Sequence, residues 1–235
     1  MWTANVFTIF PEAFPGTLGV SLIGQALAQG KWTLNLIDLK NFPVKSDRID
    51  SIPFGGGAGM VLSPIAFEKA FNSLSENQKK QKKYYLSPRG RNLTQKDLHD
   101  MSESTGVTFL CGRYEGVDQR ILDFYEFEEI SIGDFVLMGG EVAAMAFIEG
   151  IVRLLPEVVG NQESIQTDSF QNNLLEHNQY TKPRNFNGLE VPEVLLSGNH
   201  QKIEQYRLDQ SKQLTKNLRP DLWNKYISGA VKSNM

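Results

Sequence analysis

The sequence predicts an α/β fold built on a mostly parallel sheet, and two observations carry this prediction. Short apolar runs typical of buried strands alternate with stretches whose apolar residues recur at helical spacing. Three of the strands run into unusual glycine-containing loops: LSPRG at 86–90, CGRYEG at 111–116 and SIGDFVLMGG at 131–140. Ligands of open parallel sheets bind beyond the carboxyl ends of the strands, so three such loops at one edge predict a binding site.

The chain opens with a strand, a helix and a second strand. A nearly continuous apolar run predicts a buried strand at 2–10, which Pro11 ends. Apolar residues at helical spacing predict a helix over 18–28, with Gly30 at its C-terminal end. A second strand is predicted at 32–39. Because parallel neighbours need a crossover connection, this order favours a parallel pair.

The segment 41–60 is predicted to be a loop, and it ends in the glycine-rich run FGGGAGM at 54–60. A phosphate loop would end in Gly-Lys-Ser/Thr, but Met60 and Val61 follow here. A dinucleotide fingerprint would need a glycine at Met60. The run therefore predicts neither an ATP nor an NAD site. With so few side chains it can lie close to a flat ligand, and simple flexibility is the alternative interpretation.

The following elements continue the alternation. A helix is predicted at 65–74, with Ser63 as N-cap and Pro64 in its first turn. In order, the rest are a solvated connector at 76–83, a strand at 84–86 that ends at Ser87, a helix at 94–102, a strand at 107–111, a helix at 117–124, a strand at 126–130 and a helix at 142–155.

After residue 155 the chain becomes irregular and polar as far as 186. A long run without regular structure inside a compact protein is usually functional or disordered. Helices are predicted again at 199–215 and 219–228. We therefore predict an α/β domain at 1–155, a flexible linker at 156–175 and a small helical domain at 176–235.

The amino-acid composition indicates the broad class of protein to which the chain belongs. Hydrophobic residues make up 40% and charged residues 22%, which is typical of soluble globular proteins. A single cysteine excludes an internal disulfide and favours a reducing compartment. Neither a membrane span nor a secretory signal is evident, so we expect a cytoplasmic protein without a membrane partner.

The net charge of −3 is unevenly distributed along the chain. Residues 1–170 hold 15 Lys and Arg against 21 Asp and Glu, whereas residues 171–235 hold 9 against 6. A basic C-terminal segment is compatible with RNA binding through local patches. Solvated helix faces would give the same distribution.

The stretch EISIGDFVLMGGE at 129–141 is the centre of the predicted site. Glycines at both ends allow sharp turns and close approach of a ligand, and the residues between them are apolar. This pattern predicts a pocket of main-chain N–H and C=O groups, suited to the edge of a heterocyclic base. An ordinary tight joint between strand and helix is the alternative.

Read together, these segments closely resemble the bacterial tRNA (guanine-N1)-methyltransferase family, TrmD, of the SPOUT-type knotted methyltransferases. The matching segments are FPEAF at 10–14, PFGGGAGM at 53–60, YLSPRGR at 85–91, CGRYEGVDQR at 111–120, SIGDFVLMGGE at 131–141, TDSF at 167–170 and LLSGNH at 195–200. They follow in order over nearly the whole chain, and the ordered set is highly specific.

The resemblance implies the fold and the reaction. The sheet would end in a deep C-terminal trefoil knot, and two chains would form a homodimer that shares its active sites. The implied reaction transfers a methyl group from S-adenosyl-L-methionine to N1 of the guanine immediately 3′ of the anticodon of tRNA, position 37. A knotted RNA ribose 2′-O-methyltransferase and a non-catalytic RNA-binding protein are the alternatives.

The resemblance also implies a cofactor site held largely by backbone groups. The implied residues are Leu86, Ser87, Pro88, Gly112, Tyr114, Glu115, Ser131, Ile132, Gly133, Asp134, Phe135, Val136, Leu137, Gly139 and Gly140. Glu115 could instead hold Mg²⁺, and the sequence does not choose between an ion and the amino group of the cofactor. Mg²⁺ is therefore assigned to no residue.

Two catalytic residues are implied. Asp168 of TDSF would take the proton from N1 of guanine as general base, and Arg153 would stabilise the charge that develops on O6. Gly59 and Ser169 would contact the target base and its neighbour. A turn role for Asp168 and an ion pair between Arg153 and Glu149 are the structural alternatives.

Three further points follow from the residues. Ala58 stands where the family loop has proline, which predicts a looser loop. Cys111 suits the core better than covalent catalysis, because methylation of nitrogen needs no enzyme adduct. The scattered histidines predict no zinc site. Basic residues of the C-terminal segment would contact tRNA phosphates, namely Lys202, Arg207, Lys212, Lys216, Arg219 and Lys225.

Overall fold

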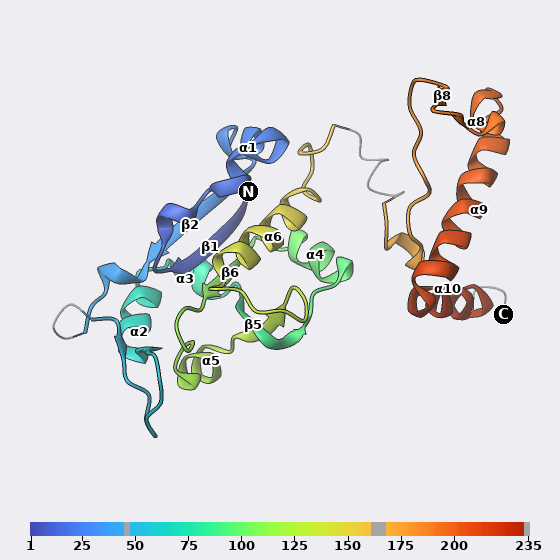
Figure 1. The fold of residues 1–235 in the computed structure, drawn as a ribbon. Helices are drawn as coiled ribbons and strands as arrows, with labels where there is room; N and C mark the ends of the chain where they lie inside the picture. The colour runs from blue at the N-terminus through green and yellow to red at the C-terminus, as the bar shows by residue number, and fades with distance from the viewer. Residues whose placement is uncertain (45–47, 161–167, 233–235) are drawn as a thin grey trace. The chain divides into compact units, whose positions relative to one another are not determined.

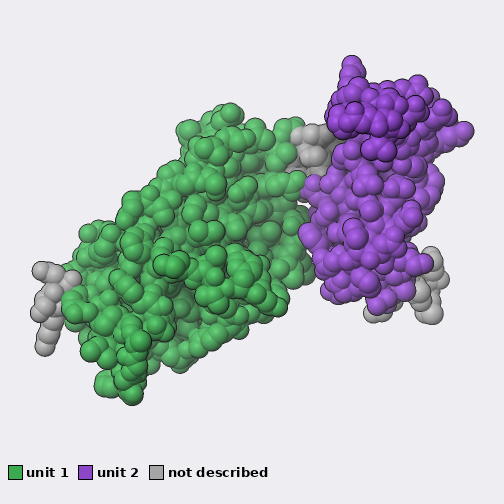
Figure 2. Space-filling view, in the orientation of Figure 1, with its two compact units in different colours: residues 1–160 green, residues 161–235 purple. Residues whose placement is uncertain are grey.

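The computed structural model describes residues 1–44, 48–160 and 168–232. The chain forms two compact units, Met1–Gly160 and Asn161–Met235, which Figure 2 colours separately. Residues 161–167 of the predicted linker, among them Thr167 of TDSF, lie outside the described residues. The boundaries predicted at 155 and 176 stay a prediction.

A five-stranded sheet forms the centre of the first unit, in the order β2-β1-β6-β5-β7 (Figure 1). All neighbouring strands in it are parallel, which confirms the predicted α/β fold with a mostly parallel sheet. The strands are β1 (Trp2–Thr8), β2 (Trp32–Asp38), β5 (Lys82–Asn92), β6 (Gly106–Cys111) and β7 (Glu128–Ser131). Because β6, β5 and β7 are neighbours, the three loops of the predicted site meet at one edge.

Helices and short turns connect these strands. The helices are α1 (Ser21–Ala28), α2 (Pro64–Asn72), α3 (Glu76–Lys79), α4 (Gln95–Ser102), α5 (Gln119–Tyr125) and α6 (Glu141–Val152). The 3₁₀ turns are η1 (Pro11–Ala13), η2 (Gly16–Gly19) and η3 (Leu39–Asn41). A short antiparallel pair, β3 (Asp50–Ser51) and β4 (Val61–Leu62), flanks the glycine-rich run.

Alternation along the strands creates two apolar cores, one on each face of the sheet. Phe109 of β6 belongs to the core that α1, α4 and α6 cover, and its ring lies 5.5 Å from that of Phe147. Leu110, the next residue, belongs to the opposite core under α2 and α5. Burial of each such side chain stabilises the fold by about 1.5–3 kcal/mol. The sheet is therefore fixed from both faces and gives the loops a rigid base.

Three predicted elements differ from the structure. The first helix begins at Ser21, not at residue 18, because the extended Val20 (φ −117°, ψ 163°) separates α1 from η2. The predicted connector at 76–83 contains the short helix α3. A capping box between Ser75 and Gln78 stabilises the N-terminus of this helix. Strand β5 does not end at Ser87. It arches out after Leu86 and pairs again with β7 at Arg91, so the first loop is an irregularity within a strand.

The second unit contains mainly helices. They are α8 (Glu193–Leu196), α9 (His200–Leu218) and α10 (Pro220–Lys232), preceded by the 3₁₀ turn η4 (Gln171–Asn173) and a hairpin of β8 (Asn185–Phe186) and β9 (Leu189–Glu190). Asn199 caps α9 by accepting a hydrogen bond from Lys202 N at 3.1 Å. The buried Thr215 hydroxyl accepts a 2.8 Å bond from Leu175 N, which ties the entering chain to α9. None of the described helices is long and apolar enough to cross a bilayer.

Candidate functional site

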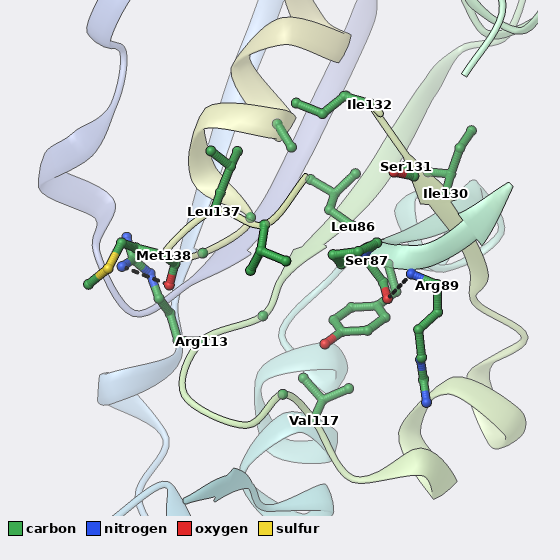
Figure 3. Close-up of a pocket in the computed structure, with 18 of the residues that line it drawn as sticks. Leu86, Ser87, Arg89, Arg113, Val117, Ile130, Ser131, Ile132, Leu137 and Met138 are labelled. Carbon is green, nitrogen blue, oxygen red and sulfur yellow. Dashed lines mark hydrogen bonds between the residues drawn. The ribbon is translucent and has the colours of Figure 1, made fainter. Parts of the chain in front are cut away.

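The three loops enclose one cavity of about 350 Å³ at the carboxyl ends of β5, β6 and β7 (Figure 3). Every residue expected to bind the cofactor lines this cavity except Asp134, which is exposed and lies outside the lining. The other residues that line it are Tyr85, Arg89, Arg113, Gly116, Val117, Ile130, Met138 and Ala143. The fold thus brings the three predicted loops together, while their role in binding a cofactor stays a prediction.

The second and third loops are in direct backbone contact. Gly140 N donates a hydrogen bond to Gly112 O at 3.1 Å. A Cβ atom on Gly140 would lie 2.8 Å from the Cα atom of Cys111, which is too close for any side chain. Glycine at this position therefore allows α6 to begin directly against the end of β6.

The third loop holds its shape through its own backbone. The Ser131 hydroxyl donates to Gly133 O at 2.9 Å and accepts from Gly133 N at 3.1 Å. Farther along, Val136 and Met138 expose 83% and 89% of their surface. Apart from the Ser131 hydroxyl, the polar groups that residues 131–140 can offer inside the cavity are main-chain N–H and C=O groups, as the sequence predicts.

An ion pair that sequence reasoning missed joins the second loop to α6. Arg113 Nη2 lies 2.9 Å from Glu141 Oε2, and the Thr8 hydroxyl donates to the other carboxylate oxygen at 2.8 Å. Arg113 also donates to Met138 O at 3.3 Å (Figure 3) and stacks on the Phe10 ring, 4.4 Å from its centroid. Arg113 therefore connects the N-terminal strand, the second loop and the third loop.

The sequence holds a signal for Glu141 but none for its partner. Glu141 begins a helix whose other buried residues are apolar, and only 2% of its surface is exposed. A buried carboxylate needs a partner. The partner stands 28 positions earlier, and nothing in the local pattern identifies it.

Burial makes Cys111 unsuited to nucleophilic catalysis. The side chain is buried at the end of β6. Burial, and after it the neighbouring Glu141 carboxylate, raises the pKa of Cys111 well above its ordinary value. A protonated thiol is a poor nucleophile, which supports a packing role for Cys111.

The structure places Gly59 against the side chain of Glu115, which lines the cavity. Gly59 has φ +85°, and a Cβ atom there would lie 2.5 Å from Glu115 Cγ. Glu115 N donates to Met60 O at 3.1 Å, so the glycine-rich run lies along the second loop. Within the part of the chain that the structure describes, no three His, Cys, Asp or Glu side chains gather as a metal site.

The two predicted catalytic residues belong to different units. Arg153 is the C-cap residue of α6 and is half-buried, and its N–H donates to Glu149 O at 3.1 Å. Asp168 is the first described residue of the second unit and is also half-buried, and its carbonyl accepts from Gln171 N at 3.3 Å. The Ser169 hydroxyl accepts a 3.0 Å bond from Glu176 N. Joint action of these residues stays a prediction.

Comparisons with a family model and with individual known proteins point to the same family. The model of the family described as tRNA (Guanine-1)-methyltransferase TrmD matches residues 1–225. The tRNA (guanine-N(1)-)-methyltransferase of Ruegeria pomeroyi is 48% identical over 231 residues, which cover 96% of this chain and 94% of the relative. The proteins of the same name from Ehrlichia ruminantium and Brucella ovis are 48% and 45% identical over 226 and 230 residues. Those alignments cover 95% and 97% of this chain, and 96% and 94% of the two relatives.

Proposed function

Because this chain belongs to the tRNA (guanine-1)-methyltransferase family, TrmD, we propose that it methylates N1 of the guanine immediately 3′ of the anticodon of tRNA, position 37. The methyl donor is S-adenosylmethionine. The observation that carries the proposal is the match itself: relatives of this name align over at least 95% of the chain, through both units.

The cavity fits this donor. Its volume of about 350 Å³ lies within the range of small-molecule sites. Apolar walls such as Leu86, Ile132 and Leu137 suit the faces of adenine, and the loop backbone suits its polar edge. When bound, S-adenosylmethionine supplies an electrophilic methyl group on a sulfonium. The residues of the chain hold it in one orientation and exclude water around it.

Asp168 is proposed as the general base. N1 of guanine carries a proton, and its electron pair becomes a good nucleophile as this proton leaves. The proton passes to the Asp168 carboxylate while N1 bonds to the methyl carbon. The carbon–sulfur bond breaks with its electron pair on sulfur, and S-adenosylhomocysteine is released. Arg153 stabilises the negative charge that develops on O6 of guanine.

Gly59, Ser169 and Glu115 are proposed to complete the site. Gly59 and Ser169 contact the target base and its neighbour. Glu115 keeps two candidate roles, as a ligand of Mg²⁺ or as partner of the donor's amino group. Comparing Glu115→Gln with the wild type for donor affinity and for the dependence of turnover on Mg²⁺ separates these two roles.

The proposal includes a trefoil knot. Strand β7 lies beside β5 at the edge of the sheet, yet α6, which follows β7, packs against α4 and β1. Between β7 and α6 the chain returns to the second loop, where Gly140 bonds to Gly112. These contacts support a chain that threads back through its own loops, an arrangement that is rare in proteins.

The proposal also includes a homodimer whose two subunits share each active site. Large apolar side chains of the first unit are exposed on and beside the third loop and at the start of α1, namely Val20, Leu22, Phe135, Val136, Met138 and Val142. Exposed apolar residues of this kind, beside the site, support a contact surface for a second copy.

The second unit is proposed to bind tRNA through its excess of basic residues. Lys202, Arg207, Lys216 and Lys225 are exposed on α9 and α10, as phosphate contacts require. Because the proposed tRNA substrate is found in the cytoplasm, we propose a cytoplasmic location for the protein.

The proposed function is tested by incubating purified protein with labelled S-adenosylmethionine and unmodified tRNA, followed by nucleoside analysis. We expect 1-methylguanosine at the position 3′ of the anticodon. A methyl group on ribose would favour the 2′-O-methyltransferase alternative. Binding of tRNA without any methyl incorporation would favour the non-catalytic alternative.

A further inference from the structure

The second unit contains a cavity of its own, with a volume of about 450 Å³. We call it the basic cavity. It is formed by the extended segment 177–184, by Val191, and by residues of α8 and α9. Figure 1 shows the chain before β8 running alongside α9. All of its lining belongs to one compact unit, and the proposed methyl-transfer site uses none of these residues.

The basic cavity is cationic. Lys182, Arg184 and Arg207 line it together with His177, and no carboxylate does. Arg184 lies 3.7 Å from the exposed Glu193 carboxylate. Lys182 and Arg207 form no ion pair with any other described residue, and both are exposed. Two cations without an internal partner at one cavity indicate an anionic occupant.

The rest of the lining is suited to a flat aromatic group. Val191, Leu195, Leu196 and Ile203 supply an apolar surface. Tyr180 exposes 45% of its surface in the cavity wall. An exposed aromatic side chain beside an apolar surface is the arrangement on which unpaired bases stack.

We propose that the basic cavity binds one unpaired nucleotide of the tRNA other than the target guanine. Its base stacks on Tyr180 and the apolar surface, and its phosphate pairs with Lys182 and Arg207. A duplex is too wide for this cavity, whereas a mononucleotide fits it. An acidic peptide would satisfy the cations but leave the aromatic wall unused. The identity of the RNA as tRNA rests on the proposed function.

The test uses full-length ¹⁵N-labelled protein titrated with the four nucleoside 5′-monophosphates, followed by NMR. We expect saturable shifts at residues 177–184 and on α9. Tyr180→Leu removes the ring and should weaken binding on the order of tenfold. Tyr180→Phe keeps the ring and should bind like the wild type.

The double variant Lys182→Gln/Arg207→Gln should lose saturable binding of the mononucleotide. Its control is Lys80→Gln/Lys82→Gln, which removes two exposed cations of the first unit, outside the cavity, and should leave mononucleotide affinity unchanged. Thermal unfolding of each variant checks that the unit is folded. With tRNA as substrate, the cavity variant should raise KM about tenfold and leave kcat unchanged.

Equal mononucleotide binding by the double variant and its control would overturn the proposal, as would the absence of saturable shifts. Displacement by a tetraglutamate peptide, without any binding of mononucleotides, would assign the cavity to an acidic protein segment. Failure of the proposed function can be distinguished from failure of this inference. A wild type that binds mononucleotides in the cavity but transfers no methyl group would support the cavity as a nucleotide site and contradict the proposed reaction.

Discussion

At the scale of single residues, the account depends most on Asp168, because it is the proposed proton acceptor. Asp168→Asn keeps the shape of the side chain and removes the basic carboxylate. We expect the rate of methyl transfer in single-turnover experiments to fall by about 10²–10⁴-fold, because general-base catalysis contributes that much. Calorimetry should show unchanged affinity for S-adenosylmethionine.

Asp209→Asn is the matched control for Asp168, because Asp209 is exposed on α9 and bonds only to Gln205 among the partners that the structure gives it. It should leave the rate near that of the wild type. Equal rates for Asp168→Asn and the wild type would remove Asp168 as the base, while leaving the cofactor cavity untouched.

Gly140 tests the backbone nature of the cavity at the same scale. In Gly140→Ala the new Cβ would lie 2.8 Å from a backbone atom of Cys111, so the loop must shift. Cofactor affinity should fall at least tenfold, measured by calorimetry. Gly229→Ala on α10 is the control, because nothing lies within 4 Å of its Cβ position. Undiminished affinity in Gly140→Ala would show that the ligand does not depend on this loop geometry.

At the scale of elements, the pair of Arg113 and Glu141 fixes α6 and the third loop to the second loop. Glu141→Gln removes the charge opposite a guanidinium whose side chain is only 24% exposed. Because one charge is left without its partner, the free energy of unfolding should fall by about 3–5 kcal/mol. Cofactor affinity should fall with it, because Arg113 also holds Met138 O.

Denaturant unfolding and calorimetry measure these two effects. Glu149→Gln, an exposed change on the same helix, is the control and should alter neither. A stable Glu141→Gln variant with normal cofactor affinity would show that the ion pair does not position the loops.

The elements that sequence reasoning placed correctly are those with a strong local signal. Strand β6 is an apolar run that only Thr108 interrupts, and α9 begins at an asparagine cap, so both follow from neighbouring residues. The predicted end of strand β5 at Ser87 is wrong, because the prediction took Pro88 and Gly90 as residues of a turn. Its recovery at Arg91 depends on pairing with β7, 39 positions later, which no local pattern contains.

Some residues of the candidate site could likewise be predicted from the sequence, and others could not. The glycines and small residues of the loops are visible in the sequence, and the fold gathers them in one cavity. Arg113 and Glu141 were missed because their partnership joins segments that only the fold brings together. The basic cavity was missed for a different reason: its cations are spread over 182–207 among ordinary surface residues.

At the scale of the whole molecule, the homodimer is the feature that the account requires most. Sedimentation of the 26.5 kDa chain should give twice this mass at micromolar concentration. Met138→Asp places a charge among the exposed apolar residues of the third loop and should shift the protein toward monomer and abolish turnover. Phe124→Asp changes a residue on α5 that is 78% exposed, and this variant should remain dimeric. An active monomer would contradict the shared site.

The most direct test of the central claim is a crystal structure of the protein grown with S-adenosylmethionine. The account predicts density for the donor in the cavity between residues 86–88, 112–115 and 131–140, with its polar edge bonded mainly to main-chain groups. Donor density elsewhere in the molecule, or a cavity without the donor at saturating concentration, would contradict it.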